Sequence, residues 1–268
     1  MIRVEDNGLV YFRQPDHFGD DQFTYAVFTR LGGASEGPFS SLNAGYHVGD
    51  DSRHVTGNRT AIAQALAFPL ESLVAAQQIH GSRVAVIDRN DRGRAAANWE
   101  GALPQTDAMI TTSRRTLLTL VVADCAILTF FDPTIPALGI AHCGWKGMLD
   151  SLGQKTIQTM HEAFGCRPQN LNLIISPSIG PCCYEVSEAV LAPLRATRAN
   201  WQSLVREDGG KTYLDLWQMA RSQAMDSGLA SGNIFSSGLC TACHTDLFYS
   251  HRAEGGNTGR FAVLAGIL

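Results

Sequence analysis

Two histidines and one cysteine of this 268-residue chain have the residue types and positions expected of a metal centre. Each follows a short apolar run typical of a buried strand: His80 follows Val74–Ile79, Cys125 follows Leu117–Val122, and His142 follows Ala137–Ala141. Side chains at strand ends can be aimed by a rigid scaffold into one cleft. Two imidazoles and a thiolate suit zinc, and three protein ligands leave a fourth position for water or substrate. Gaps of 45 and 17 residues favour a catalytic site over a zinc finger.

Other roles fit the same residues. Buried histidine and cysteine often only pack, and Cys125 near a histidine also has the composition of a thiol nucleophile. A nucleophile must be free, whereas zinc neutralises a ligated thiolate, so two histidines rather than one favour the metal. Asp124, directly before Cys125, is a candidate to orient His80 or His142, to act as an acid or base, or to form a structural salt bridge.

The composition is that of an ordinary globular protein, with 45% hydrophobic and 17% charged residues and a net charge of −4. With no basic surplus, we expect no nucleic-acid partner. The longest apolar stretch, 117–131, is interrupted by Asp124 and too short to span a bilayer. Residues 1–14 lack the apolar core of a secretory signal, so we expect a cytoplasmic location. The odd number of cysteines, seven, favours reduced thiols.

Hydrophobic periodicity predicts both strands and helices, without a regular alternation of the two. The predicted strands are 9–13, 23–29, 74–79, 83–88, 107–111, 116–125, 137–142, 171–175, 233–238 and 260–267. The predicted helices are 52–66, 147–164, 186–198 and 214–228. We expect 74–79 and 83–88 to pair around His80, and prolines 133 and 136 to mark the turn between strands 116–125 and 137–142. The pattern indicates one α+β domain over residues 1–268.

Four more cysteines stand in two conspicuous places. Cys240-Thr241-Ala242-Cys243-His244 matches the haem-attachment pattern of c-type cytochromes, but that chemistry needs export, and no export signal is present. A second metal site is the alternative for this stretch. The adjacent Cys182 and Cys183 are expected to pack a loop.

The stretches QIHG, TDAMIT, ADC, AHCGWKG, SPSIGPCCYEV, YLDLW and TGR, in this order after TRLGGAS at 29–35, resemble the motifs of the laccase-domain family. This family is also called the YfiH or polyphenol oxidase family. The resemblance implies a single-domain layered α/β/β/α sandwich with mixed sheets. It also implies that the metal ligands are His80, Cys125 and His142.

The resemblance further implies a zinc-dependent purine nucleoside phosphorylase acting on adenosine, inosine, guanosine and S-methyl-5'-thioadenosine, with adenosine deaminase activity. Its partners would be a purine nucleoside and phosphate, and the protein a monomer or homodimer. The alternatives are a copper-dependent polyphenol oxidase and a cytoplasmic hydrolase that edits peptidoglycan precursors. A metal-binding scaffold that works through a partner is the non-enzymatic alternative.

Further site residues follow from matches to single family motifs. Arg30 and Asn43 lie in the glycine-rich segment 30–51, which the resemblance makes part of the substrate cleft. Arg59 matches the Asn-Arg pair of the family. Tyr184 and Glu185 lie in a loop fixed by two prolines, and we expect them to point into the cleft.

Lys146 stands where the family usually has arginine, four residues after His142 and at the start of a predicted helix. A helix start attracts anions, so we expect Lys146, Arg30 and the metal to hold phosphate. Lysine supplies a point charge without the bidentate grip of arginine. Ile127 stands where the family usually has proline, and Ser250–Ala253 also departs from the family pattern.

Overall fold

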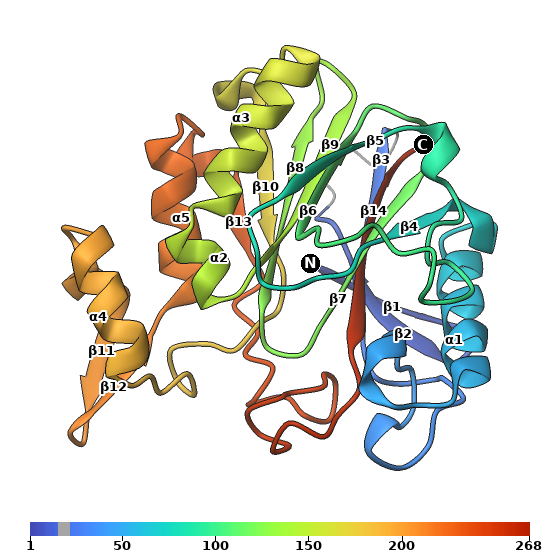
Figure 1. Cartoon of the computed structure of the whole chain (residues 1–268), viewed down its shortest axis with the longest axis horizontal. Helices are drawn as coiled ribbons and strands as arrows, with labels where there is room; N and C mark the ends of the chain where they lie inside the picture. The colour runs from blue at the N-terminus through green and yellow to red at the C-terminus, as the bar shows by residue number, and fades with distance from the viewer. Residues whose placement is uncertain (16–21) are drawn as a thin grey trace.

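The computed structural model describes residues 1–15 and 22–268 and contains two six-stranded sheets stacked on one another (Figure 1). The first sheet has, in spatial order, β1 (Ile2–Asp6), β2 (Leu9–Arg13), β3 (Phe23–Phe28), β14 (Phe261–Ile267), β7 (Leu117–Val122) and β4 (Leu73–Ala75). The second has β13 (Ile234–Ser236), β10 (Asn172–Ile175), β8 (Ala126–Asp132), β9 (Ala137–Cys143), β6 (Ala108–Thr111) and β5 (Val84–Ile87). Both sheets are mixed, because β4–β7, β5–β6 and β10–β13 are parallel pairs among antiparallel ones.

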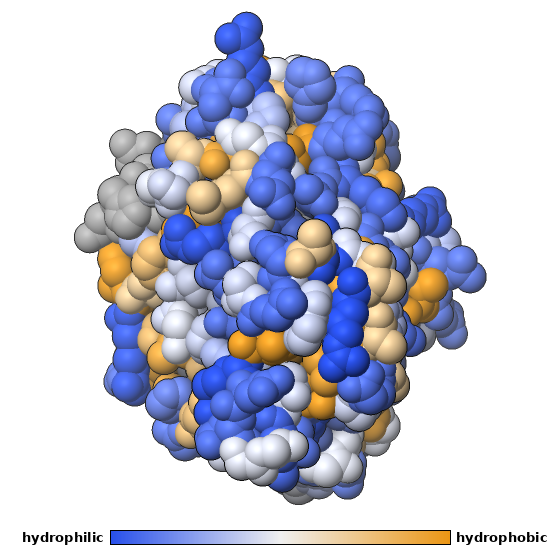
Figure 2. All heavy atoms as spheres, turned by 90° about the vertical axis from the view of Figure 1, so that its left-hand side faces the viewer, coloured by the Kyte–Doolittle hydropathy of each residue, from blue (hydrophilic) through white to orange (hydrophobic). Residues whose placement is uncertain are grey.

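Helices cover the two outer faces. Helix α1 (Ser52–Ala65) lies against the first sheet. Helices α2 (Trp145–Leu149), α3 (Leu152–Phe164), α4 (Glu188–Thr197) and α5 (Leu216–Asp226) lie on the side of the second sheet, with a small hairpin of β11 (Val205–Asp208) and β12 (Lys211–Leu214) beyond α4 (Figure 1). Figure 2 shows that the outer face of this helical side is mostly hydrophilic. No helix in the described part of the chain is long and apolar enough to cross a membrane.

The alternation of side chains along the central strands produces three apolar layers. In β7, Leu118 and Leu120 point into the layer between the sheets, whereas Leu117 and Val121 pack toward α1. On the second sheet, Ile140 of β9 faces the first sheet, while its neighbour Ala141 faces the helices. The expected α+β class and the α/β/β/α layering are thus confirmed.

Two details of the predicted strands are wrong. The strands around His80 do not pair with each other, since β4 belongs to the first sheet and β5 to the second. Residues 126–132, for which no strand is predicted, form β8. The turn at prolines 133 and 136 therefore joins β8 to β9. Continuous apolar runs do not reveal where a buried strand breaks, because both of its faces are covered.

Candidate metal centre and cavity

The three predicted ligands converge, although they come from separate strands. The ligand atoms of His80, Cys125 and His142 all lie within 4.8 Å of one another. Cys125 Sγ is 3.8 Å from His80 Nε2, and the two imidazole rings meet edge to face with centroids 4.8 Å apart. Zinc bond lengths of about 2.0 Å to nitrogen and 2.3 Å to sulfur give a tetrahedral edge of about 3.6 Å, so the donor atoms fit one zinc ion.

Two of the three residues lie where the chain passes from one sheet to the other. His80 lies between β4 and β5, and Cys125 lies between β7 and β8. The backbone at His80 and at Asp124 is left-handed, with φ of 60° and 88°. Non-glycine residues adopt this conformation only where surrounding contacts hold them, and such positions concentrate at functional sites.

Asp107 holds both histidines, which is one of the three candidate roles of Asp124. The buried Asp107 carboxylate accepts hydrogen bonds from the backbone N–H groups of Ile79, His80 and Gly81 at 2.8–3.1 Å. Its Oδ1 also lies 2.9 Å from Nδ1 of His142. Asp107 therefore fixes the turn that carries one imidazole and directs Nε2 of the other toward the cluster.

Asp124 contacts neither histidine, so the idea that it orients one of them is wrong. Its Oδ1 accepts a hydrogen bond from Thr241 Oγ1 at 2.6 Å, and its Oδ2 accepts one from the backbone N–H of Arg252 at 2.7 Å. Asp124 thus ties the segment after β7 to the loop before β14. Its side chain still lines the cavity beside the cluster.

Gly144 leaves the space in which the cluster forms. A Cβ at this position would lie 2.8 Å from Cys125 Sγ and 3.4 Å from Cδ2 of His80. Real Cβ atoms do not approach a sulfur so closely, so any side chain here would displace the thiol. The glycine between His142 and Trp145 is a steric requirement of the site.

Electrostatics prepare Cys125 to act as a thiolate. Burial disfavours the charged form of its side chain, but His142 and His80 beside it lower the pKa of the thiol below its usual value. Burial also disfavours the charged form of His142, but the Cys125 thiolate and Asp107 outweigh it and raise the pKa of that imidazole. The site therefore favours a thiolate ligand at neutral pH.

The cluster forms part of the wall of a cavity of about 410 Å³. The apolar and aromatic residues that line this cavity include Val121, Val122, Ile179, Leu216, Trp145 and Tyr184. The polar residues that line it include His47, Gln78, Asp124, His251, Arg252 and Arg260. A mostly apolar wall with a few polar groups and a metal cluster is typical of a small-molecule site.

Tyr184 is the one predicted substrate-binding residue that lines this cavity. Its neighbour Glu185 does not line this cavity; it forms an ion pair with Lys211 at 2.9 Å and lines an adjoining pocket together with Tyr184 and Arg252. Lys146 is exposed, lies over the Trp145 ring with Nζ 5.6 Å from the centroid, and is not among the described residues that line the cavity.

Arg30 and Arg59 hold loops together and do not line the cavity. Arg30 forms an ion pair with Glu254 at 2.8 Å and stacks on Tyr249 with 4.5 Å to the ring centroid. Arg59 is 1% exposed, and its guanidinium donates to the backbone oxygens of Ala44 and Ala95. Both pack between segments that are distant in the sequence.

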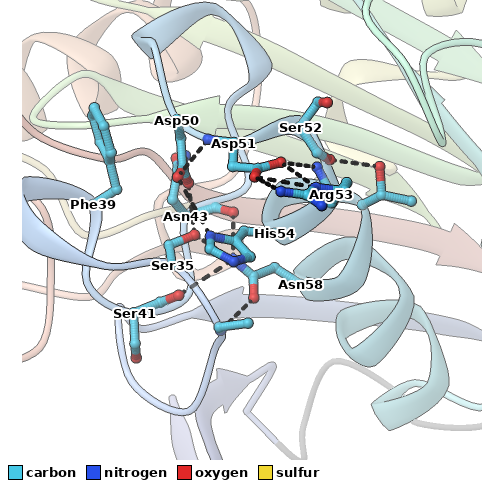
Figure 3. Close-up of polar contacts among 12 residues, drawn as sticks. Ser35, Phe39, Ser41, Asn43, Asp50, Asp51, Ser52, Arg53, His54 and Asn58 are labelled. Atoms are coloured by element: carbon cyan, nitrogen blue, oxygen red, sulfur yellow. Dashed lines mark hydrogen bonds and ion pairs between the residues drawn. The ribbon is translucent and has the colours of Figure 1, made fainter.

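Asn43 also has a structural position, at the centre of a buried polar network (Figure 3). Its amide donates to Asp50 Oδ2 at 2.8 Å, and its backbone oxygen accepts from Asn58. Its Oδ1 accepts from the backbone N–H of Arg260 at 2.9 Å. Asn43 therefore acts on the cavity indirectly, by holding the backbone of a residue that lines it.

Several residues of the site that the sequence did not single out lie inside recognised stretches. Arg260 and Trp145, which line the cavity, belong to TGR and AHCGWKG, and Asp107, which holds the histidines, belongs to TDAMIT. His251 and Arg252 lie in the segment that departs from the family pattern. His47 had no signal beyond its place in the glycine-rich segment.

Comparison with known proteins agrees with this geometry. A family model described as multi-copper polyphenol oxidoreductase laccase matches residues 24–268. The chain is 39% identical over 240 residues to a protein named purine nucleoside phosphorylase YlmD of Bacillus subtilis, which covers 89% of this chain and 86% of that protein. It is 29% identical over 224 residues to a protein of an unknown prokaryote named adenosine deaminase RL5, covering 83% and 85% of the two chains.

Solved structures show the same fold. The crystal structure of the hypothetical protein YfiH of Bacillus licheniformis superposes with a TM-score of 0.93 at 32% identity, covering 99% of this chain and 98% of the other. That of YlmD from Geobacillus stearothermophilus gives 0.92 at 35% identity over 98% and 97%. Since the family model and these relatives match nearly the whole chain, the protein belongs to the laccase-domain family, the family of YfiH and YlmD.

Proposed function

We propose that this protein is a zinc-dependent purine nucleoside phosphorylase that also deaminates adenosine. The observation that carries the proposal is the convergence of His80, Cys125 and His142 on the wall of a cavity of nucleoside size. Relatives named purine nucleoside phosphorylase and adenosine deaminase support an enzyme that acts on purine nucleosides. We expect adenosine, inosine, guanosine and S-methyl-5'-thioadenosine as substrates.

The residues present suit zinc. Two imidazoles and one thiolate leave one coordination position free, as catalytic zinc sites do. When bound, zinc supplies a Lewis acid that activates water or polarises an oxygen of the substrate. Asp107 keeps Nε2 of His142 directed at the cluster, and Gly144 keeps the space beside Cys125 free.

We assign the apolar and aromatic residues of the cavity wall to the purine base. Trp145 and Tyr184 provide aromatic faces, and Val122 and Ile179 provide aliphatic contacts. A planar base held there would present its ribose or its exocyclic amine to the metal cluster. Holding the reactants in this way supplies much of the catalysis in a group transfer.

We assign phosphate to the two guanidinium groups that line the cavity. Arg260 lines the same cavity as the cluster, its backbone N–H donates to Asn43 Oδ1, and its Nη1 donates to the backbone oxygens of Thr258 and Gly259. Nη1 of Arg252 donates a hydrogen bond to the backbone oxygen of Glu185. Preorganised arginines can grip an oxyanion bidentately. We therefore assign phosphate binding to Arg260 and Arg252, because Arg30 and Lys146 do not line the cavity.

In this scheme Asp124 is a positioning residue. Its carboxylate fixes the backbone of Arg252 and the Thr241 hydroxyl, and so sets the distance between the arginine loop and the thiolate of Cys125. His47 faces the same space, and burial together with Arg260 lowers the pKa of its imidazole to about 4. A neutral His47 can donate or accept a hydrogen bond to substrate at physiological pH.

The older copper-oxidase description of the family fits these residues less well. The potential metal-binding clusters in residues 1–15 and 22–268 contain two histidines between them, His80 and His142. A multicopper centre needs many more imidazole ligands, since copper(II) prefers nitrogen donors.

The test is turnover of inosine with inorganic phosphate by zinc-loaded protein, followed as hypoxanthine and ribose 1-phosphate. Adenosine without phosphate tests deamination in parallel. We expect both activities to disappear in His80→Ala and Cys125→Ala. Turnover that requires added copper and consumes dioxygen, with no release of base, would refute the proposal. The cytoplasmic location, single domain, and monomeric or dimeric state remain predictions.

A further inference from the structure

A second cluster of metal-binding side chains lies outside the cavity. Cys182 and Cys183 come from the loop after β10, and Cys240 and Cys243 from the loop after β13. The four sulfur atoms lie within 4.8 Å of one another, with Cys243 Sγ 3.5 Å from that of Cys182 and 3.4 Å from that of Cys183. All four are free thiols. The expectation that the adjacent pair only packs a loop is therefore incomplete.

The spacing of these sulfurs matches a single tetrahedral metal ion. Zinc–sulfur bonds of about 2.3 Å place neighbouring sulfurs about 3.8 Å apart. The observed separations bracket this value. A tetrahedral set of four thiolates is typical of structural zinc. Cys240 and Cys243 have the two-residue spacing of a zinc ribbon, and the other half of the site is the adjacent pair.

The surroundings favour a bound cation over four separate thiols. The backbone N–H of Gly180 donates to Cys240 Sγ at 3.2 Å, as backbone amides do to metal-bound thiolates. A divalent ion would neutralise the negative charge of thiolates held this close together. Cys182 and Cys243 are also exposed, so a bound ion would protect them from oxidation.

We propose that Cys182, Cys183, Cys240 and Cys243 bind a second zinc ion with a structural role. The two loops it joins already touch, because Ser178 forms a parallel bridge with Cys240. One loop carries Ile179 and Tyr184 of the cavity wall. The other carries Thr241, which donates to Asp124 beside the catalytic cluster. The second ion thus fixes the wall that faces the substrate, and its presence does not depend on the reaction catalysed.

The test is the metal content of protein purified in reducing, chelator-free buffer with zinc supplied. We expect two zinc ions per chain in the wild type and one in either His80→Ala or Cys243→Ser. The combination of both substitutions should leave none. Cys166→Ser is the matched control, since Cys166 is a buried thiol outside both clusters, and it should keep two.

X-ray absorption of the His80→Ala protein identifies the remaining site even if Cys243→Ser does not fold. We expect four sulfur neighbours at about 2.3 Å and no nitrogen. Hydrogen exchange of segments 178–186 and 239–244 should accelerate in Cys243→Ser and stay unchanged in Cys166→Ser. A wild-type zinc content of one that falls to zero in His80→Ala, iron in place of zinc, a nitrogen ligand in His80→Ala, or a disulfide among the four cysteines would each overturn the proposal.

Discussion

Replacement of Asp107 by asparagine tests whether this carboxylate organises the catalytic metal cluster. The carboxylate accepts four hydrogen bonds, two at each oxygen: Oδ1 faces His80 N–H and His142 Nδ1, and Oδ2 faces the N–H groups of Ile79 and Gly81. Asparagine has nearly the same shape but one oxygen and one NH₂ group. In either orientation of the amide, its NH₂ group faces two N–H groups that donated to the carboxylate, so two of the four hydrogen bonds are lost.

The two orientations of the amide have different costs. If its oxygen faces His142, the part-buried N–H groups of Ile79 and Gly81 lose their acceptor, at a cost of up to about 1–3 kcal/mol each. If its NH₂ faces His142, Nδ1 must accept and the proton moves to Nε2, which removes that nitrogen as a ligand. Loss of such a supporting partner typically weakens metal binding by about 10–100-fold.

The assay is competition for zinc between the protein and a chromophoric chelator. We expect Asp107→Asn to bind the catalytic zinc about 10–100-fold more weakly and to lose nucleoside turnover in parallel. Asp124→Asn is the matched control, because it makes the same chemical change beside Cys125 without touching either imidazole. Its zinc affinity should stay near that of the wild type. Equal zinc affinity in Asp107→Asn and the wild type would refute the role of Asp107.

Three further predictions concern space, anion binding and pH. Gly144→Ala should abolish zinc binding at the catalytic cluster, because its Cβ would lie 2.8 Å from the sulfur of Cys125. The control is Gly57→Ala on the open surface of a helix, which should bind zinc normally and raise the free energy of unfolding by about 0.5–1 kcal/mol. Arg260→Lys should raise the phosphate KM of phosphorolysis about tenfold or more and affect deamination much less. Lys146→Ala is the control and should change neither reaction, whereas equal losses of phosphorolysis and deamination in Arg260→Lys would contradict the phosphate site. Burial and Arg260 lower the pKa of His47 to about 4, so between about pH 6.5 and 4 this imidazole binds a proton only in the unfolded chain. The free energy of unfolding should therefore fall as the pH falls through that window, and an NMR titration of His47 near pH 6.5 in the folded protein would contradict this.

The central buried strands and the three candidate ligands could be predicted from local pattern, whereas the four-layer arrangement followed only from the family resemblance. Apolar runs such as 117–122 and 137–141 identify buried strands, and a polar residue at the end of such a run is conspicuous. The role of Asp107 depends instead on register. Strand β6 pairs with β9 so that Ala108 lies opposite Ala141, which puts Asp107 beside His142. No periodicity in either segment specifies that pairing.

The predicted cleft residues that do not line the cavity show the converse difficulty. Arg30, Asn43 and Arg59 lie in or next to a loop rich in glycine, a composition shared by binding loops and by tightly packed ones. Their partners, Glu254 for Arg30 and the backbone of Arg260 for Asn43, are more than 200 residues away in the chain. Only the folded structure shows that these polar side chains are satisfied internally and support the cavity from behind.

The position of the catalytic cluster follows from the way the two sheets are connected. Each of the passages β4 to β5 and β7 to β8 leaves the first sheet and enters the second, and each carries one ligand. His142 at the end of β9 supplies the third from the second sheet itself. The passages bend through left-handed residues, His80 and Asp124, and an ion bound to the three side chains would offset such local strain because it would bind only the folded arrangement. Such an ion would hold together the two passages between the sheets at the wall of the cavity.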